Sequence, residues 1–208
     1  MPPKLYIPLS SLTGYQLGIL WAIANYDPTD NYLLCRYQVR YFLEQIQLLR
    51  PTLQIQESQS RTGPQYRLKM SGLSLDELFQ LGWTPRNANE RNVPPLDDYR
   101  DFLRAWIEIH GRVKYGSHPE HKELKKIKMQ IYGNRILMQS INNILVEYAG
   151  VAPKKLSSAT PNHGKTSILA YQSAAEIERV LWYIEGDPCY VPFWDAAFEM
   201  VRNPVISK

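Results

Sequence analysis

A β-hairpin followed by an amphipathic helix occurs twice in this chain of 208 residues, and this repeat limits the folds that the chain can adopt. The first copy, residues 52–83, reads "TLQIQES", the turn "QSRTGP", "QYRLKMS" and the helix-like "LSLDELFQLGW". The second copy, residues 154–186, reads "KKLSSATPNHGKTSILAYQ" and then "SAAEIERVLWYIEG". Alternating apolar residues predict the strands, and apolar residues at every third or fourth position predict the helices. The pattern indicates two similar α+β units in one chain.

Each copy is preceded by an amphipathic helix and, further upstream, by an almost wholly apolar one. The apolar segments are "SLTGYQLGILWAIANYD" at 11–27 and "DDYRDFLRAWIEIHG" at 97–111. A helix that is apolar on nearly every face is expected to be buried on several sides. We therefore predict that these two helices pack on each other about a pseudo-twofold axis. Three small residues would let the backbones approach closely: Gly18, Ala22 and Ala105.

The second half contains a further predicted hairpin, because "RVKYG" and "KKIKMQIYG" flank the loop-like "SHPEHKEL". The complete unit is then αββαββα. In the first half, "NYLLCR" runs almost directly into the next helix, so its first hairpin is expected to be shortened or to lack a strand. The predicted parts are an N-terminal repeat at 1–83, a C-terminal repeat at 96–186 and a helical tail at 187–208. The linker at 84–95, "TPRNANERNVPP", has the composition of an exposed connection.

One stretch, "ATPNHGKTS" at 159–167, matches a relaxed phosphate-loop pattern through Gly164, Lys165 and Thr166. A working phosphate loop follows a buried strand and begins a helix, whose N-terminus binds the phosphates. Here "KKLSS" is too polar for a central strand, and "SILAYQ" has the composition of a strand rather than a helix. The stretch is therefore predicted to be a hairpin turn, and no nucleotide cofactor is expected.

Amino-acid composition limits the cellular compartments and the kinds of partner that are expected for this chain. Apolar residues make up 44% of the chain and charged residues 21%, as in globular proteins, and the net charge of +4 permits a polyanionic partner. The only cysteines, Cys35 and Cys189, lie far apart in the sequence, which favours free thiols in a reducing compartment. The start "MPPKLYIPLS" lacks a signal-peptide pattern, and no apolar run is long enough to cross a bilayer. We expect a soluble protein of the bacterial cytoplasm or of an organelle, neither secreted nor bound to a membrane.

The repeated αββαββα order resembles the LAGLIDADG family of homing endonucleases and related maturases and bacterial regulators. The motif that names the family aligns with "LWAIANYDP", Leu20–Pro28, and with "LRAWIEIHG", Leu103–Gly111. The resemblance implies a monomer of fold class α+β, in which two pseudo-symmetric repeats pack through their first helices and antiparallel sheets form a saddle. It also implies a partner, double-stranded DNA or structured RNA, with the saddle in the major groove.

The resemblance further implies where cleavage chemistry would lie. In the family, the eighth motif residue of each helix is an acid that binds divalent metal, which activates water. The aligned residues are Asp27, a candidate catalytic residue and Mg²⁺ ligand if the protein cleaves, and His110, a poor ligand for this cation. Glu108 cannot replace His110, because residues two apart on a helix point roughly 200° away from each other. Without the resemblance, Asp27 would be interpreted as a helix-end acid before a proline turn, and His110 as a residue that complements the helix dipole.

Basic residues on the predicted hairpins are the candidate DNA contacts. Lysine and arginine would bind phosphates, and asparagine, glutamine and arginine would read base edges. Single lysines on strands also serve as solvated edge residues that prevent aggregation. The candidates are Arg36, Arg40, Arg61, Arg67, Lys69, Arg112, Lys114, Lys122, Lys125, Lys126, Lys128, Lys154, Lys155 and Lys165.

The resulting hypothesis is a double-stranded nucleic-acid-binding protein of the homing-endonuclease type with impaired or lost double-strand cleavage, acting as a regulator or with an intron. An active homing endonuclease or nickase that uses divalent metal is one alternative. A protein–protein adaptor on the same scaffold is another, with the aromatic-rich helix at about 192–202 as its binding element. His118 and His121, in "HPEH", are interpreted as solvated loop residues rather than metal ligands.

Overall fold

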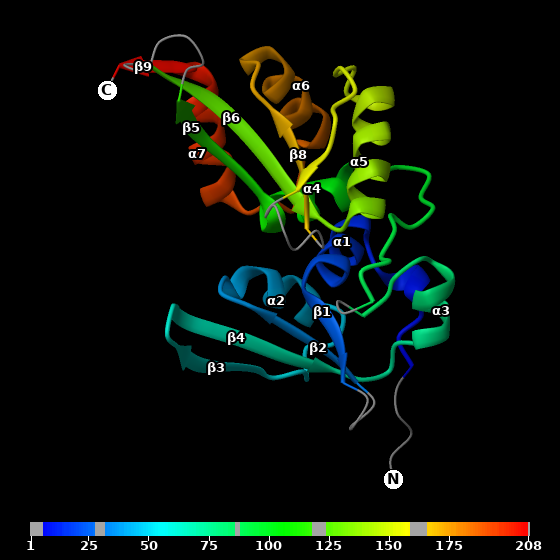
Figure 1. Ribbon diagram of the computed structural model, residues 1–208. Coiled ribbons are helices and arrows are strands. Elements are labelled where there is room, and N and C mark those ends of the chain that lie inside the picture. The colour runs from blue at the N-terminus through cyan, green and yellow to red at the C-terminus, as the bar shows by residue number, and fades with distance from the viewer. Residues whose placement is uncertain (1–5, 28–31, 86–87, 118–123, 159–165, 208) are drawn as a thin grey trace. The chain divides into compact units, whose positions relative to one another are not determined.

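The computed structural model of the chain describes most of its residues (Figure 1). The described ranges are 6–27, 32–85, 88–117, 124–158 and 166–207. The chain divides into two compact units, residues 1–105 and 106–208, and the boundary falls inside a helix. Within the described ranges, no helix is both long enough and apolar enough to cross a membrane.

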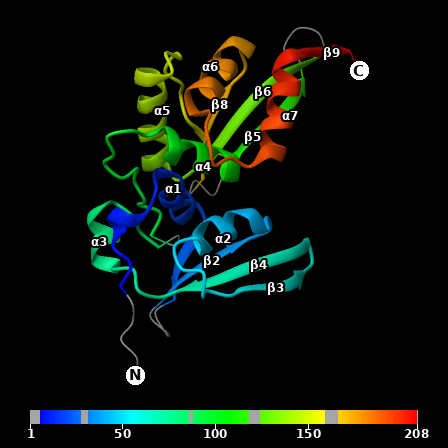
Figure 2. The ribbon, with the colours of Figure 1, turned by 180° about the vertical axis from the view of Figure 1, so that it is seen from behind.

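The first unit consists of a four-stranded antiparallel sheet and its helices. After a short 3-10 turn at Leu9–Ser11, its elements are α1 (Gly14–Ile23), β1 (Ala24–Asp27), β2 (Tyr32–Tyr37), α2 (Arg40–Gln47), β3 (Ile55–Ser60), β4 (Gly63–Met70) and α3 (Leu75–Gln80). The strand order is β1-β2-β4-β3, and α2 lies along one face of this sheet in both views (Figures 1 and 2).

The second unit repeats this arrangement. Its elements are α4 (Arg100–His110, which begins in the first unit), β5 (Gly111–Ser117), β6 (Leu124–Gly133), α5 (Arg135–Tyr148), β7 (Ser157–Ser158), β8 (Ser167–Tyr171) and α6 (Ala174–Ile184), followed by α7 (Val191–Arg202) and β9 (Val205–Ser207). The strand order is β5-β6-β8-β7, and β9 pairs with the first three residues of β6. Both units therefore have the predicted αββαββα order and the same order of strands in the sheet.

The first hairpin of the first unit is short, as expected, but it has both strands, which corrects the alternative that one strand is missing. β1 has only four residues, and it pairs with β2 from Ala24 opposite Cys35 to Asp27 opposite Tyr32. The sequence "ANYD" supplies this strand, although it was predicted to continue the apolar helix. The strand is favoured because its backbone groups pair with β2 and Ala24 is fully buried.

Arg91 stabilises the C-terminal end of α1. It is buried, although it belongs to the linker that was predicted to be exposed. Its side chain is only 5% exposed, and its guanidinium donates hydrogen bonds to the carbonyl oxygens of Trp21, Ala24 and Thr84. The last carbonyls of a helix have no partner within the helix, so a buried arginine satisfies groups that would otherwise be costly to bury. At least this part of the linker is thus packed against the first unit.

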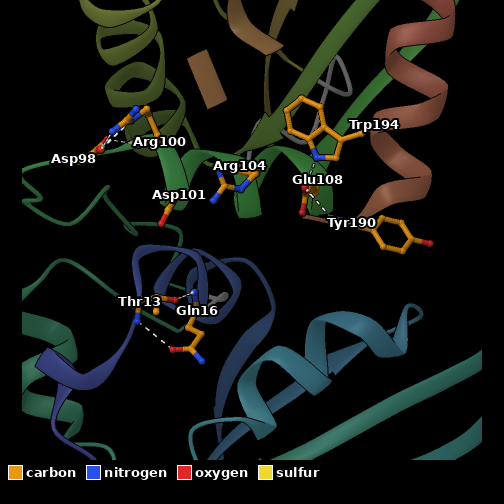
Figure 3. Close-up of polar contacts among 9 residues, drawn as sticks. All are labelled: Thr13, Gln16, Asp98, Arg100, Asp101, Arg104, Glu108, Tyr190 and Trp194. Atoms are coloured by element: carbon orange, nitrogen blue, oxygen red, sulfur yellow. Dashed lines mark hydrogen bonds and ion pairs between the residues drawn. The ribbon is translucent and has the colours of Figure 1, made fainter. Parts of the chain in front are cut away.

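Helix α1 is buried on nearly all sides, as its composition predicts. Thr13 and Gln16 form a capping box at its start (Figure 3), and nine of its ten residues are buried. A Cβ atom placed on Gly18 would lie 2.6 Å from the carbonyl oxygen of Phe102 and 2.8 Å from the Cβ of Ala105. Within the first unit, α1 therefore packs closely against the beginning of α4, through small residues that the sequence singled out.

The phosphate-loop match lies in the second hairpin of the second unit. Ser157 pairs with Ile168 and Ser158 with Ser167, both antiparallel. The strand β8, rather than a helix, follows Thr166. The predicted hairpin is confirmed, while its turn, including Lys165, lies outside the described residues.

The two cysteines have different environments, which gives a first prediction. Cys35 is fully buried on β2, and burial raises the pKa of its thiol to about 12, whereas Cys189 is partly exposed. Since the thiolate is the reactive form, Cys35 stays protonated and inert at pH 8. We expect Ellman's reagent to titrate one thiol rapidly in the folded chain and two after denaturation. Two rapid thiols in the folded chain would contradict the burial of Cys35.

Candidate nucleic-acid interface

The face of the first sheet that points away from α2 carries basic side chains. Along β2 and β4, the buried residues Leu33, Cys35, Leu68 and Met70 face the helices. Because successive side chains on a strand point to opposite faces, the residues between them form the other side, called here the outer face. The cations on the outer face of the first sheet are Arg36, Arg67 and Lys69, all exposed.

The second sheet has an outer face of the same kind. On β6, the residues that face the helices are Ile127, Met129 and Ile131, all buried. The alternating positions and their partners on β5 put four cations on the outer face: Arg112, Lys114, Lys126 and Lys128. No acidic residue occupies this outer face on the parts of β5 to β8 that the structure describes.

Like charges stand directly opposite each other on both outer faces. Arg36 is the register partner of Arg67, and Lys114 is the register partner of Lys128. Directly opposed like charges on neighbouring antiparallel strands destabilise a sheet by several tenths of a kcal/mol or more. Two such pairs therefore lower the stability of the isolated protein, and an anion lying along the outer faces would relieve the repulsion.

Aromatic rings hold some of these cations in place. The Nζ atom of Lys69 lies 4.6 Å from the ring centre of Tyr32, and the guanidinium carbon of Arg112 lies 5.9 Å from that of Tyr132. Such contacts restrain a long side chain while leaving its charge exposed. The Tyr32 hydroxyl in turn donates a hydrogen bond of 3.1 Å to Asp27 Oδ2. Asp27 thus lies on the outer face of the first sheet, bonded to the tyrosine whose ring contacts Lys69.

Other predicted DNA contacts lie elsewhere. Arg40 begins α2 and forms an ion pair of 2.9 Å with Glu44, and Lys154, between α5 and β7, forms one of 2.7 Å with Glu176. Their charges are already balanced, so the structure does not bring these two together with the outer-face cations. Arg61 occupies the turn between β3 and β4, Lys155 is exposed before β7, and Lys125 points to the opposite side from Lys126. Lys122 and Lys165 lie outside the described residues, as do His118 and His121.

The motif helices end without an acid in either unit. Helix α4 ends at His110 and β5 starts at Gly111, as the aligned motif predicts. Helix α1 ends at Ile23 and β1 starts at Ala24, so Ile23 is the structural counterpart of His110. The sequence alignment assigned this role to Asp27, which lies four residues further on and belongs to a strand.

The residues at the two helix ends do not fit a magnesium site. Magnesium binds oxygen ligands in octahedral geometry, and Ile23, which is 2% exposed, offers no donor atom. The imidazole of His110 lies against the Trp106 ring, with ring centres 4.6 Å apart. Among the described residues, no three His, Cys, Asp or Glu side chains gather where they could hold a metal ion. The residues at the two helix ends therefore offer no set of oxygen ligands for a divalent metal.

Glu108, the remaining acid of the second motif, has a structural role that the sequence did not reveal. It is 6% exposed, and its Oε1 atom accepts hydrogen bonds from the backbone N–H of Tyr190, at 3.0 Å, and from the indole N–H of Trp194 (Figure 3). A buried carboxylate needs such donors, and these two fasten α7 to α4. The available signal was an acid within an apolar helix, together with an aromatic-rich tail.

Comparisons with solved structures agree with this architecture. The meganuclease I-AabMI bound to uncleaved DNA is similar with a TM-score of 0.58, 11% identity and 92% coverage of both chains. The homing endonuclease I-GzeII in complex with its DNA target has a TM-score of 0.57 and 9% identity, with 92% of this chain and 90% of that chain covered. Full-length WhiA from Thermatoga maritima has a TM-score of 0.53 and 13% identity, with 94% of this chain and 61% of that chain covered.

No protein-family profile matches the chain, and no curated protein matches its sequence. At identities this low, the likeness establishes the fold. The chain has the two-repeat α+β fold of the LAGLIDADG homing endonucleases, as the sequence resemblance implied.

Proposed function

We propose that this chain binds double-stranded DNA as a monomer, through the outer faces of its two sheets, and does not cleave both strands. The observation that carries the proposal is the presence of two pairs of directly opposed like charges, Arg36 with Arg67 and Lys114 with Lys128. DNA phosphates would neutralise them and release counterions, which is the main source of non-specific affinity. The DNA bound to the similar solved structures supports this partner.

Polar side chains beside the cations suit base recognition. The outer face of the first sheet also carries the amide side chains of Asn25, Gln56 and Gln65, of which the first two are exposed. Amides of this kind hydrogen-bond the edge of adenine in the major groove, which admits β-structure. The deep and narrow major groove of duplex RNA does not, so we expect DNA to be preferred over duplex RNA.

The ends of the motif helices support a loss of cleavage. Ile23 ends one helix, His110 ends the other, and Glu108 is held by Tyr190 and Trp194. A role as a regulator, or an intron-associated role, would require DNA binding without cleavage. The second candidate function, nicking with a divalent metal, is favoured by one observation, the position of Asp27 on the outer face of the first sheet.

Supercoiled plasmid incubated with the protein and Mg²⁺ distinguishes these two functions. We expect retarded migration of the plasmid at low salt and, after protein removal, no nicked or linear product above background. The Asp27→Ala variant should behave in the same way. Nicking by the wild type that disappears in Asp27→Ala would overturn the proposal and support the nickase, and absence of retardation would remove DNA binding altogether.

A further inference from the structure

An aromatic groove lies on the helical side of the second unit, between the end of α5 and α6. Its volume is about 490 Å³. The lining residues are Tyr148, Ala149, Glu178, Arg179, Trp182 and Tyr183. None of them belongs to the outer faces, so the groove is a separate feature of the molecule.

The aromatic side chains of this groove are unusually open to solvent. Trp182 is 66% exposed and Tyr148 is 52% exposed. The rings of Tyr148 and Tyr183 are nearly parallel, with an interplanar angle of 14° and centres 6.1 Å apart. Exposed tryptophan and tyrosine side chains that gather in one groove mark interaction sites in soluble proteins, because such residues contribute most of the binding energy at interfaces.

The groove is held in shape and bordered by acids. The guanidinium of Arg179 donates a hydrogen bond of 3.1 Å to the carbonyl of Gly150, which ties α6 to the end of α5. Glu178 and Trp182 lie one turn apart on α6 and share one side, and Glu185 follows the last residue of that helix; both glutamates are exposed. These two carboxylates outnumber Arg179, the cation of the lining, and the resulting negative charge, in contrast to the net charge of +4, disfavours nucleic acid as the occupant.

We propose that this groove binds a proline-rich segment of a partner protein that carries lysine or arginine next to its prolines. Polyproline II segments dock into grooves lined with aromatic rings, since proline rings pack on flat aromatic faces and the ligand loses little conformational entropy. The parallel rings of Tyr148 and Tyr183 with Trp182 supply those faces, and Glu178 and Glu185 complement a basic ligand. The proposal is independent of DNA binding.

Fluorescence polarisation of a labelled dodecapeptide, with two Pro-x-x-Pro repeats and flanking arginines, tests this proposal on the full chain. We expect saturable binding that weakens at least tenfold in Trp182→Ala and severalfold in Glu178→Gln. Leu48→Ala removes an equally exposed apolar side chain, 67% exposed, from the first unit and should bind like the wild type. Thermal unfolding of each variant verifies that it is folded.

A second peptide, with every proline replaced by alanine, tests the conformation of the ligand. It should bind at least fivefold more weakly than the proline peptide. Equal or tighter binding of the alanine peptide would overturn the proposal in favour of a helical ligand. Absence of binding at millimolar peptide, or unchanged affinity in a folded Trp182→Ala variant, would overturn it as well.

Discussion

Replacing Lys114 and Lys128 together by glutamine is expected to weaken binding of a random-sequence DNA duplex about fiftyfold at roughly 0.1 M salt, because each phosphate contact contributes close to one unit of log K there. The same double variant should be slightly more stable than the wild type. The two lysines face each other across β5 and β6, so their removal relieves a repulsion worth several tenths of a kcal/mol. Fluorescence anisotropy and chemical denaturation measure the two effects.

Weaker DNA binding together with higher stability would distinguish a DNA-binding surface from a solvated sheet edge, because lysines that only solvate an edge would not affect DNA binding. Arg135→Gln removes one charge from an exposed position at the start of α5, away from the outer face, and serves as the control. It should leave affinity within about twofold, because charges far from the DNA are screened. If the double lysine variant binds as well as the wild type, the outer face of the second sheet is not the DNA contact.

Gly18→Ala is expected to lower the free energy of unfolding by about 2 kcal/mol, through overpacking of the contact between α1 and the start of α4. The new Cβ would lie 2.6 Å from the carbonyl oxygen of Phe102, and backbone cannot move aside as a flexible side chain can. Gly18→Leu should prevent folding. In an exposed helix, the change from glycine to alanine would instead stabilise by up to about 1 kcal/mol.

Gly116→Ala is a matched control for this prediction. An added Cβ at Gly116 would have the Lys128 side chain and the Lys126 carbonyl at 3.8 to 3.9 Å, which is ordinary contact. Its stability should stay within about 0.5 kcal/mol of the wild type, as for most substitutions that create no clash. A stabilised Gly18→Ala variant, measured by urea denaturation, would contradict the close packing of these helices.

Much of the fold could be predicted because its signals are local. Hydrophobic periodicity and turn residues are written into each segment, so the repeated hairpins, the following helices and the tail helix α7 were all accessible. The small residues Gly18 and Ala105 also indicated close packing of the apolar helices. The strand patterns on either side of residues 159–165 were sufficient to predict a hairpin there, and β7 and β8 confirm it.

The end of α1 could not be predicted in the same way. "ANYD" continues an apolar run, and Pro28 suggested a helix end there, yet pairing with β2 and the guanidinium of Arg91 end the helix at Ile23. Arg91 lies 70 residues beyond Trp21 in the sequence, and no local pattern places its guanidinium at the end of the helix. The four-residue difference bears on the proposed function, because α1 ends at Ile23 and Asp27, the predicted metal ligand, belongs to β1.

The sequence predicted which segments are basic, but it did not predict which of their side chains share one face of a sheet. The sequence singled out basic hairpins, but only the strand register shows that Arg36 opposes Arg67 and that Lys114 opposes Lys128. The ion pair of Lys154 with Glu176 also depends on tertiary structure, whereas that of Arg40 with Glu44 is local to α2, and both residues fall outside the outer-face set. The contact of Glu108 with Trp194 spans the whole second repeat, and no local pattern encodes it.

Salt dependence of DNA affinity tests the central claim most directly. The dissociation constant of the wild type for a random-sequence 20-base-pair duplex would be measured by anisotropy between 50 and 300 mM KCl. If all seven cations on the described parts of the outer faces contact phosphates, the slope of log K against log salt is expected to be about −6, since each phosphate contact contributes roughly −0.9. A slope near zero, or no binding at the lowest salt, would contradict the account.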